Sequence, residues 1–324
     1  MANIRRPRRG SLQYWPHVRA KKETPVVKSW ASSSQLTLQG FAGYKVGMTH
    51  LLFKDTRPVS PTKGDLVSFP VTILECPPLK VYGIRLYQHT HYGPKVLRDF
   101  YAPKLDKHLQ RLVSVPAAEK LAASMGQFDT FLPKSSDLRL LVYTQPSLAG
   151  VGKKTPELFE VAVGGKDFAQ KVTFAKSCLE KDIHVKDVFK AGVKVDVHSV
   201  SKGKGFKGAV QRFGISLRGH KSEKKRRAAV LGPLCPARIA WGMLLPGQVG
   251  YHTRTEYNKD LVLVDSQIDK INPKGGFVHY GLVKHDFVLV RGSIPGAAKR
   301  LVRITEPIRQ IKGIGAIDIQ HIAH

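Results

Sequence analysis

Cysteine is scarce in this sequence. The 324 residues include three cysteines, Cys76, Cys178 and Cys235, which lie far apart and form no C-x-x-C pair. This spacing argues against a disulfide framework and against a cysteine zinc site. A reducing compartment fits such cysteine usage.

Long hydrophobic runs are also missing. No stretch approaches the ~20 consecutive apolar residues that a membrane-spanning helix needs. No apolar run follows the N-terminal arginines, as a secretory signal would require. We therefore expect no membrane as a partner.

Familiar catalytic motifs are absent as well. The sequence contains no G-x-S-x-G, no H-E-x-x-H and no G-x-x-x-x-G-K-[ST]. His89 and His91 would share a face on a strand, but no third ligand is evident, and a surface pair explains them better than a metal site. We predict no enzyme activity, no catalytic residue, no metal and no cofactor.

Acidic residues are few relative to basic ones. The chain has 53 Lys+Arg against 24 Asp+Glu, which gives a net charge of +29 and a pI near 10.1. A charge this large strains a compact state by self-repulsion, and a permanent polyanionic partner would relieve the strain. The hydrophobic fraction of 42% is sufficient for a folded core. We therefore expect a folded protein that binds nucleic acid.

The cations concentrate after a predicted strand. Val193, Val195 and Val197 alternate with polar residues, as in a half-buried strand. From Ser201 onward apolar residues thin out and glycines are spread among the cations. These are Lys202, Lys204, Lys207, Arg212, Arg218, Lys221, Lys224, Lys225, Arg226 and Arg227, with only Glu223 against them. Such a segment cannot offset its ordering entropy alone, so we expect an unfolded or extended loop that a polyanion orders.

Two other interpretations of this stretch are open. Gly203-Lys-Gly-Phe-Lys-Gly208 matches G-x-G-x-x-G, but a dinucleotide site requires a helix starting at the last glycine and an acidic residue about 20 positions on. We expect neither, because Gly214 follows closely and Glu223 lies inside the cationic tract. A solvated surface loop is the second alternative. Polyphosphate binding accounts better for cations interleaved with glycines.

Patterning divides the chain into six segments. Residues 1–34 form a basic arm whose aromatic residues can stack on bases or pack on a partner. Residues 35–90 and 257–324 form a β body, with 188–200 as one of its strands, and 91–187 an α/β insertion. Residues 201–256 are the extended basic loop. We expect helices over 117–125 and after Asp167, and strands over 138–143, 261–264, 277–283, 287–290 and 301–304. Short strands between glycine turns indicate a small closed barrel.

Six stretches together carry a family resemblance. They are Arg8-Arg9-Gly-Ser-Leu12, Gly40-Phe-Ala-Gly-Tyr-Lys-Val-Gly-Met-Thr49, Ser201-Lys-Gly-Lys-Gly-Phe-Lys-Gly208, Pro236-Ala-Arg238, Gly247-Gln-Val-Gly-Tyr-His-Thr-Arg-Thr-Glu256 and Val290-Arg-Gly-Ser-Ile-Pro-Gly296. In these stretches, which span nearly the whole chain, the sequence resembles the universal large-subunit ribosomal protein three, in its archaeal and eukaryotic form.

The resemblance implies a translation-protein-type β-barrel body with an α/β insertion, a basic N-terminal arm and a long internal RNA-binding loop. It implies a structural ribosomal protein of the cytoplasm that binds near the 3′ end of large-subunit rRNA, supports subunit assembly and buttresses the peptidyl-transferase centre. The implied neighbours are large-subunit proteins fourteen and twenty-four-e, and no homo-oligomer is implied.

The family resemblance and the basic tracts together give a set of expected rRNA contacts. They are Arg5, Arg6, Arg8, Arg9, Lys202, Lys204, Lys207, Arg212, Arg218, His220, Lys221, Lys224, Lys225, Arg226, Arg227, Arg238, Tyr251, His252 and Arg254. Pro233, Leu234 and Cys235 are the expected loop tip near the peptidyl-transferase centre. Most of these would be phosphate contacts, with RNA shape giving the specificity.

The sequence departs from the family at two positions. Leu234 stands where the family has a tip tryptophan, and leucine cannot stack as an indole does. Gly214 stands where the eukaryotic branch has a modified histidine, so that modification is not expected. A nucleic-acid enzyme or an assembly chaperone with the same charge remains the alternative function at this point.

Overall fold

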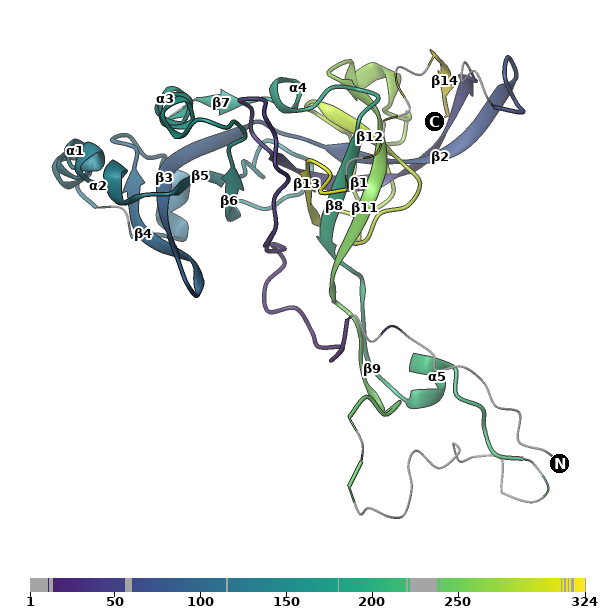
Figure 1. The fold of residues 1–324 in the computed structure, drawn as a ribbon. Coiled ribbons are helices and arrows are strands. Elements are labelled where there is room, and N and C mark those ends of the chain that lie inside the picture. Colours follow the sequence, from purple (N-terminus) through teal and green to yellow (C-terminus); the bar gives the residue numbers. More distant parts are fainter. Residues whose placement is uncertain are drawn as a thin grey trace. The chain divides into compact units, whose positions relative to one another are not determined.

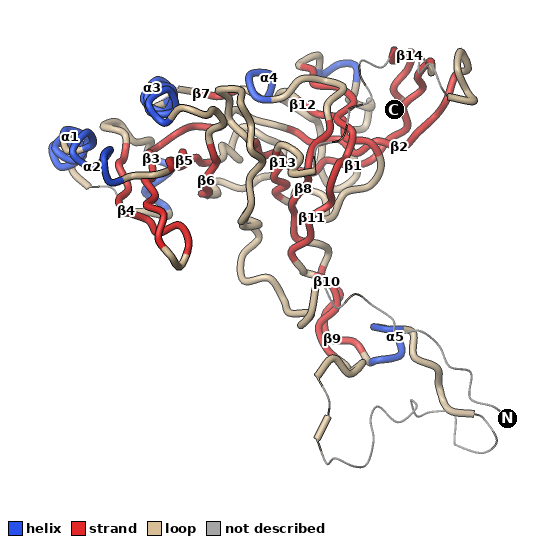
Figure 2. The backbone as a smooth tube through the Cα atoms, in the orientation of Figure 1, coloured by secondary structure: helices blue, strands red, loops and turns tan. Residues whose placement is uncertain are grey.

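A computed structural model describes residues 11, 14–55, 60–114, 116–179, 181–219, 221, 238–239, 241–309, 311, 313, 315 and 318–323. Contacts divide the chain into two compact units. Unit 1 comprises Met1–Lys22 and Val200–Thr253, and unit 2 comprises Glu23–Ser199 and Arg254–His324. The predicted segments do not coincide with these units. Unit 1 combines the first part of the predicted arm, residues 1–34, with most of the predicted basic loop, residues 201–256. Figures 1 and 2 show that strands dominate the chain.

The centre of unit 2 is a closed ring of strands. β1 (Gly40–Lys54), β2 (Leu66–Glu75), β12 (Phe287–Arg291), β11 (Thr253–Asp265), β8 (Lys194–Val200) and β13 (Leu301–Thr305) are hydrogen-bonded in that order. β13 also pairs with β1, with Tyr44 opposite Leu301, and this pairing closes the ring. β14 (Asp318–Ile322) pairs with the far end of β1. Ring closure removes the open sheet edges, as expected for the predicted barrel.

β8 is buried more completely than the predicted half-buried strand. Its polar residues Asp196 and His198 are enclosed along with Val195 and Val197. Burial is possible because each polar group has partners. The two Asp196 carboxylate oxygens accept hydrogen bonds from the backbone N–H groups of Asn258 and Ile308, at 2.7 and 3.0 Å.

A second sheet carries the α/β part of unit 2. β3 (Leu79–Thr90) lies between β4 (Gly93–Tyr101) and β5 (Asp137–Tyr143), β5 pairs with β6 (Leu158–Ala162), and β7 (Asp182–Ile183) pairs with β3. The α-helices of unit 2 are α1 (Ala118–Gly126), α2 (Phe128–Phe131), α3 (Phe168–Cys178) and α4 (Val185–Val188), and its 3₁₀ turns are Lys107–Arg111, Leu132–Lys134 and Ile268–Lys270. The predicted helices over 117–125 and after Asp167 are confirmed. The second sheet starts at Leu79, earlier than the predicted insertion.

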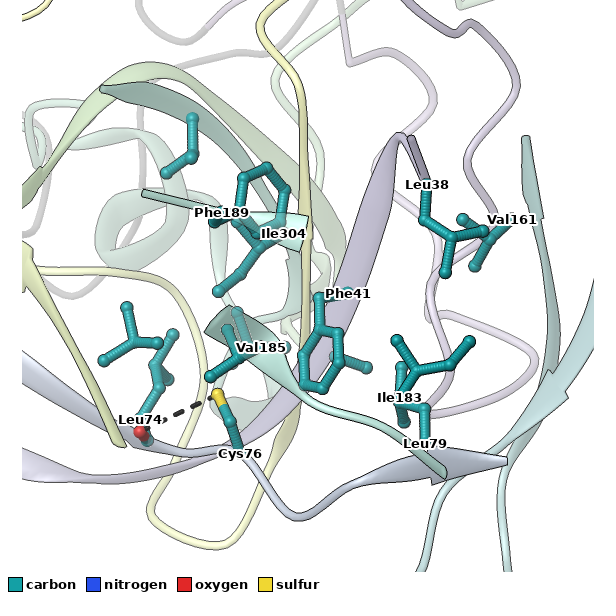
Figure 3. Packing of buried hydrophobic residues seen from close by; sticks show 14 of the residues in the cluster. Leu38, Phe41, Leu74, Cys76, Leu79, Val161, Ile183, Val185, Phe189 and Ile304 are labelled. Atoms are coloured by element: carbon teal, nitrogen blue, oxygen red, sulfur yellow. Dashed lines mark hydrogen bonds between the residues drawn. The ribbon is translucent and has the colours of Figure 1, made fainter. Parts of the chain in front are cut away.

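One hydrophobic core joins the barrel and the second sheet. Figure 3 shows Leu38, Val161 and Ile183 on one side of Phe41, and Val185 and Cys76 on the other. An isolated bridge between Leu38 and Val163 links the residues just before β1 to those just after β6. Since the core is continuous, unit 2 forms a single scaffold.

The predicted strand over 277–283 is wrong. Phe277 and Gly281 exchange backbone hydrogen bonds of 2.9 Å, which closes a tight turn, and His279 and Gly281 have φ values of 62° and 100°. A buried carboxylate fixes the following residues. Glu75 accepts hydrogen bonds from the backbone N–H groups of Lys284 and His285, at 2.6 and 3.1 Å, and from the Tyr280 hydroxyl. Turn chemistry therefore prevails over the β propensity of this run.

Candidate nucleic-acid interface

The basic stretch has more regular structure than its composition predicts. β9 (Gly203–Lys207) and β10 (Gly247–Gly250) form an antiparallel ribbon in which Lys207 lies opposite Gly247 and Phe206 opposite Gln248. The predicted unfolded or extended loop did not include this strand pairing. The missing information was the partner strand, which lies far along the sequence and supplies hydrogen bonds that local patterning does not reveal.

Gly250 permits the irregular end of the ribbon. Its φ is +72°, and a Cβ at this position would lie 1.9 Å from the Lys202 carbonyl oxygen. The register shifts between Gln248 and Gly250, which is a β-bulge. No L-residue with a side chain fits there without moving the backbone, so glycine fixes how the ribbon presents Lys202 and Lys204.

The dinucleotide interpretation has one feature in its favour and stronger features against it. A helix, α5 (Ala209–Phe213), does follow Gly208, contrary to our expectation, and ends at Gly214 with φ 66°. However, α5 has only five residues, and Gly203 and Gly205 lie within the antiparallel strand β9 rather than in a turn after a parallel strand. The arrangement lacks the parallel strand, crossover helix and tight first turn of a dinucleotide fold.

Arg212 anchors the N-terminal arm to the ribbon. Its two Nη atoms donate hydrogen bonds to the carbonyl oxygens of Leu245, at 2.9 Å, and His17, at 3.3 Å. Its guanidinium also lies 4.9 Å from the centroid of the Phe213 ring. Burial lowers the pKa of the guanidinium. In this structure the predicted phosphate contact therefore binds backbone carbonyls and positions residue 17 of the arm.

Two residues on the return side hold the arm in the same way. His252 is only 9% exposed, and its Nδ1 donates a hydrogen bond of 2.8 Å to the Val18 carbonyl oxygen. The Tyr251 carbonyl oxygen accepts one of 2.8 Å from the Ala20 N–H, and the Arg19 guanidinium lies 5.1 Å from the Tyr251 ring centroid. Direct contact of His252 with RNA is thus restricted by its burial.

An aromatic cluster covers these anchors. Trp15 lies 5.9 Å from Phe213 and 6.2 Å from Trp241, measured between ring centroids, and His17 lies 5.9 Å from His252. Trp241 is nevertheless 76% exposed, and Phe206 on the ribbon is 75% exposed. Exposed aromatic rings among cations are suited to stack on unpaired bases. Both were missed from sequence, although Phe206 stands between Lys204 and Lys207.

The predicted contacts fall into three groups. Lys202, Lys204, Lys221 and Arg238 are exposed, and Lys207, Arg218 and Arg254 are partly exposed, with Arg254 belonging to unit 2. Arg212, Tyr251 and His252 hold the arm, as described above. The remaining predicted residues lie outside the described part of the chain; they are Arg5, Arg6, Arg8, Arg9, His220, Lys224, Lys225, Arg226, Arg227, Pro233, Leu234 and Cys235.

Other kinds of site have little support in the described ranges. Within them no three His, Cys, Asp or Glu residues converge as metal ligands, and no helix is both long and apolar enough to cross a bilayer. Cys76 is buried with a free thiol, and Cys178 is also free. His89 lies on β3 and His91 in the turn after it, and both are exposed.

Comparison with known proteins gives a single family. The family model described as "Ribosomal protein L3" matches residues 1–316. The large ribosomal subunit protein uL3 of Methanobrevibacter smithii is 43% identical over 314 residues, covering 95% of this chain and 94% of its own. The uL3 proteins of Methanosphaera stadtmanae and Methanocaldococcus jannaschii are 42% and 40% identical, covering 100% and 95% of this chain and 98% and 92% of their own.

Proposed function

The chain belongs to the ribosomal protein L3 family, and we propose that it is a structural constituent of the large ribosomal subunit that binds large-subunit rRNA. It is a ribosomal protein of the cytoplasm and not an enzyme. The chaperone and enzyme alternatives have no comparable support, since the match to the family extends over nearly the full chain.

The observation that carries this function is the β9–β10 ribbon with its anchored arm. Lys202 and Lys204 are exposed on a backbone whose geometry Gly250 fixes, so the cations are presented in a defined arrangement. Salt-dependent phosphate contacts of this kind supply affinity and register. Phe206 and Trp241 add exposed rings for unpaired bases, a way of recognising RNA that does not depend on reading base pairs.

Further details of the proposal rest on the family resemblance. The protein binds near the 3′ end of large-subunit rRNA and supports subunit assembly. Its loop tip, Pro233 to Cys235, approaches the peptidyl-transferase centre and buttresses it. Large-subunit proteins fourteen and twenty-four-e are its neighbours, and it acts as a single copy. Among the described residues, the proposed phosphate contacts are Lys202, Lys204, Lys207, Arg218, Lys221, Arg238 and Arg254.

Binding to deproteinised rRNA tests this function. The triple variant Lys202→Gln/Lys204→Gln/Lys207→Gln removes three ribbon charges, so the slope of log affinity against log salt should lose about 2–3 in magnitude, at about 0.7–0.9 per phosphate. A control, Lys95→Gln/Lys274→Gln, changes two exposed lysines of unit 2. Wild-type protein should also prefer large-subunit to small-subunit rRNA. Equal binding of both RNAs, or an unchanged slope in the ribbon variant, would contradict the proposal.

A further inference from the structure

A cationic cavity is built entirely from residues of unit 2. Its volume is about 630 Å³, and its lining includes Lys28, Trp30, Asp137, Arg139, Lys166 and Lys171. Cavities of this size are typical of sites that hold a ligand as large as a nucleotide. None of these residues belongs to the basic loop, so the family motifs of that loop do not account for the cavity.

Backbone hydrogen bonds define the cavity wall. The segment that precedes β1 runs beside the end of β6, where Figure 1 shows the purple chain near that strand. The Gly165 N–H donates to the Ser33 carbonyl at 3.0 Å, and the Gly164 N–H donates to the Thr37 carbonyl at 2.8 Å. A Cβ on Gly164 would lie 2.4 Å from the Gln35 carbonyl oxygen, so this close approach requires glycine. The wall is therefore a fixed part of the fold.

The charge of the lining is positive and only partly compensated. Lys171 lies 3.9 Å from Asp137, and Arg139 lies 3.4 Å from Glu160, which is close to the cavity but does not line it. Lys28 and Lys166 have no acidic partner within 4.0 Å among the residues that the structure describes. The cavity thus retains positive charge that an anionic ligand would neutralise.

Two hydrogen-bond donors in the lining lack acceptors. The Trp30 Nε1 and Arg139 Nε atoms are both buried, and neither has a partner within the described part of the chain. A buried N–H without an acceptor costs free energy, and native proteins contain few of them. The two residues, from distant segments, line the same cavity, although the two nitrogen atoms themselves are covered. A ligand with several oxygen acceptors would satisfy both once the side chains shift to expose these atoms.

We propose that this cavity binds a phosphodiester of large-subunit rRNA and is a second RNA-binding site, separate in sequence from the basic loop. The inference rests on the proposed function. Lys28 and Lys166 supply the uncompensated charge, and the Trp30 and Arg139 N–H groups donate to the RNA oxygens. Lys171 remains paired with Asp137.

The test is the salt dependence of binding to deproteinised large-subunit rRNA. The variant Lys28→Gln/Lys166→Gln should reduce the magnitude of the slope by about 0.7–0.9, the contribution of the one phosphate contact that is lost. The control Lys95→Gln/Lys274→Gln should leave the slope at its wild-type value. Trp30→Phe keeps an aromatic ring and deletes one unpaired N–H, and it should weaken binding about tenfold.

The outcomes separate this inference from the proposed function. If the cavity variants bind rRNA as wild type does while the ribbon triple variant binds more weakly, the cavity inference fails and the proposed function stands. If the ribbon variant also binds normally, the proposed function fails as well. If the cavity variants bind rRNA normally but enter large subunits less often in cells, the ligand is an acidic protein segment and the RNA assignment is wrong.

Discussion

Replacing Gly250 by alanine should open the β9–β10 ribbon. A left-handed conformation costs an alanine about 1–2 kcal/mol. At Gly250 the new Cβ would also lie 1.9 Å from the Lys202 carbonyl oxygen, a backbone atom that no rotamer change can move. Relieving this overlap breaks the 3.1 Å hydrogen bond from the Tyr251 N–H to the same oxygen, which adds about 1 kcal/mol. We expect a total cost of about 2–3 kcal/mol.

Two other glycines of the ribbon provide matched controls. Gly205 has φ +70° but open space where a Cβ would lie, so Gly205→Ala should cost about 1–2 kcal/mol from the backbone alone. Gly208 has φ −67° and equally open space, so Gly208→Ala should cost under about 1 kcal/mol. The order of destabilisation should be Gly250, then Gly205, then Gly208.

Amide hydrogen exchange over residues 203–207 and 247–250 measures these costs directly. Exchange by local opening accelerates about tenfold for each 1.4 kcal/mol. Gly250→Ala should therefore accelerate exchange about 30- to 150-fold, and it should weaken rRNA binding because Lys202 and Lys204 lose their defined positions. Equal exchange in the Gly250 and Gly205 variants would refute the steric effect of the Lys202 carbonyl, and a large effect at Gly208 would refute the role of backbone conformation.

Three further substitutions test other parts of the structure. Glu75→Gln replaces one acceptor oxygen by a donor in front of buried N–H and O–H groups, so urea unfolding should show a loss of about 3 kcal/mol. Burial, and next the Arg303 charge, lower the pKa of His198 from 6.5 to about 4. Because the folded state favours the neutral imidazole, the free energy of unfolding should fall by about 2–3 kcal/mol as the pH drops from 6.5 toward 4. In urea titrations at several pH values, His198→Gln should remove this pH dependence. Phe206→Ala should weaken rRNA binding by about 1–3 kcal/mol, with an unchanged melting temperature because the ring is 75% exposed; a fall in stability with no loss of affinity would contradict the stacking role.

Sequence patterning predicted those elements that local periodicity determines. Helix α1 and strand β5 follow their predicted ranges closely, because each has a regular apolar repeat with a clear end. The strand prediction over 277–283 was wrong because these residues adopt turn conformations, which the alternation of apolar residues does not reveal. Ribbon pairing was missed because Lys207 finds its partner at Gly247, and that contact is not local.

The candidate site was predicted in its charge but not in the role of each residue. Exposure of Lys202 and Lys204 follows from a stretch with few apolar residues. Arg212 and His252 were assigned to RNA from the family resemblance and the surrounding cations, whereas they bind carbonyl oxygens of residues 17 and 18. The cavity in unit 2 was not predicted as a site. Lys28 belongs to the predicted basic arm, but Arg139 and Lys166 come from two other segments that the sequence does not bring together.

Sedimentation in a sucrose gradient tests the central claim most directly. A lysate is washed at high salt, separated, and this protein is followed across the fractions. An integral, RNA-embedded constituent should migrate with the large subunit after the wash, and the ribbon triple variant should be depleted from that peak. Release of the wild-type protein to the top of the gradient would contradict the account, since it would show a peripheral association that depends on charge alone.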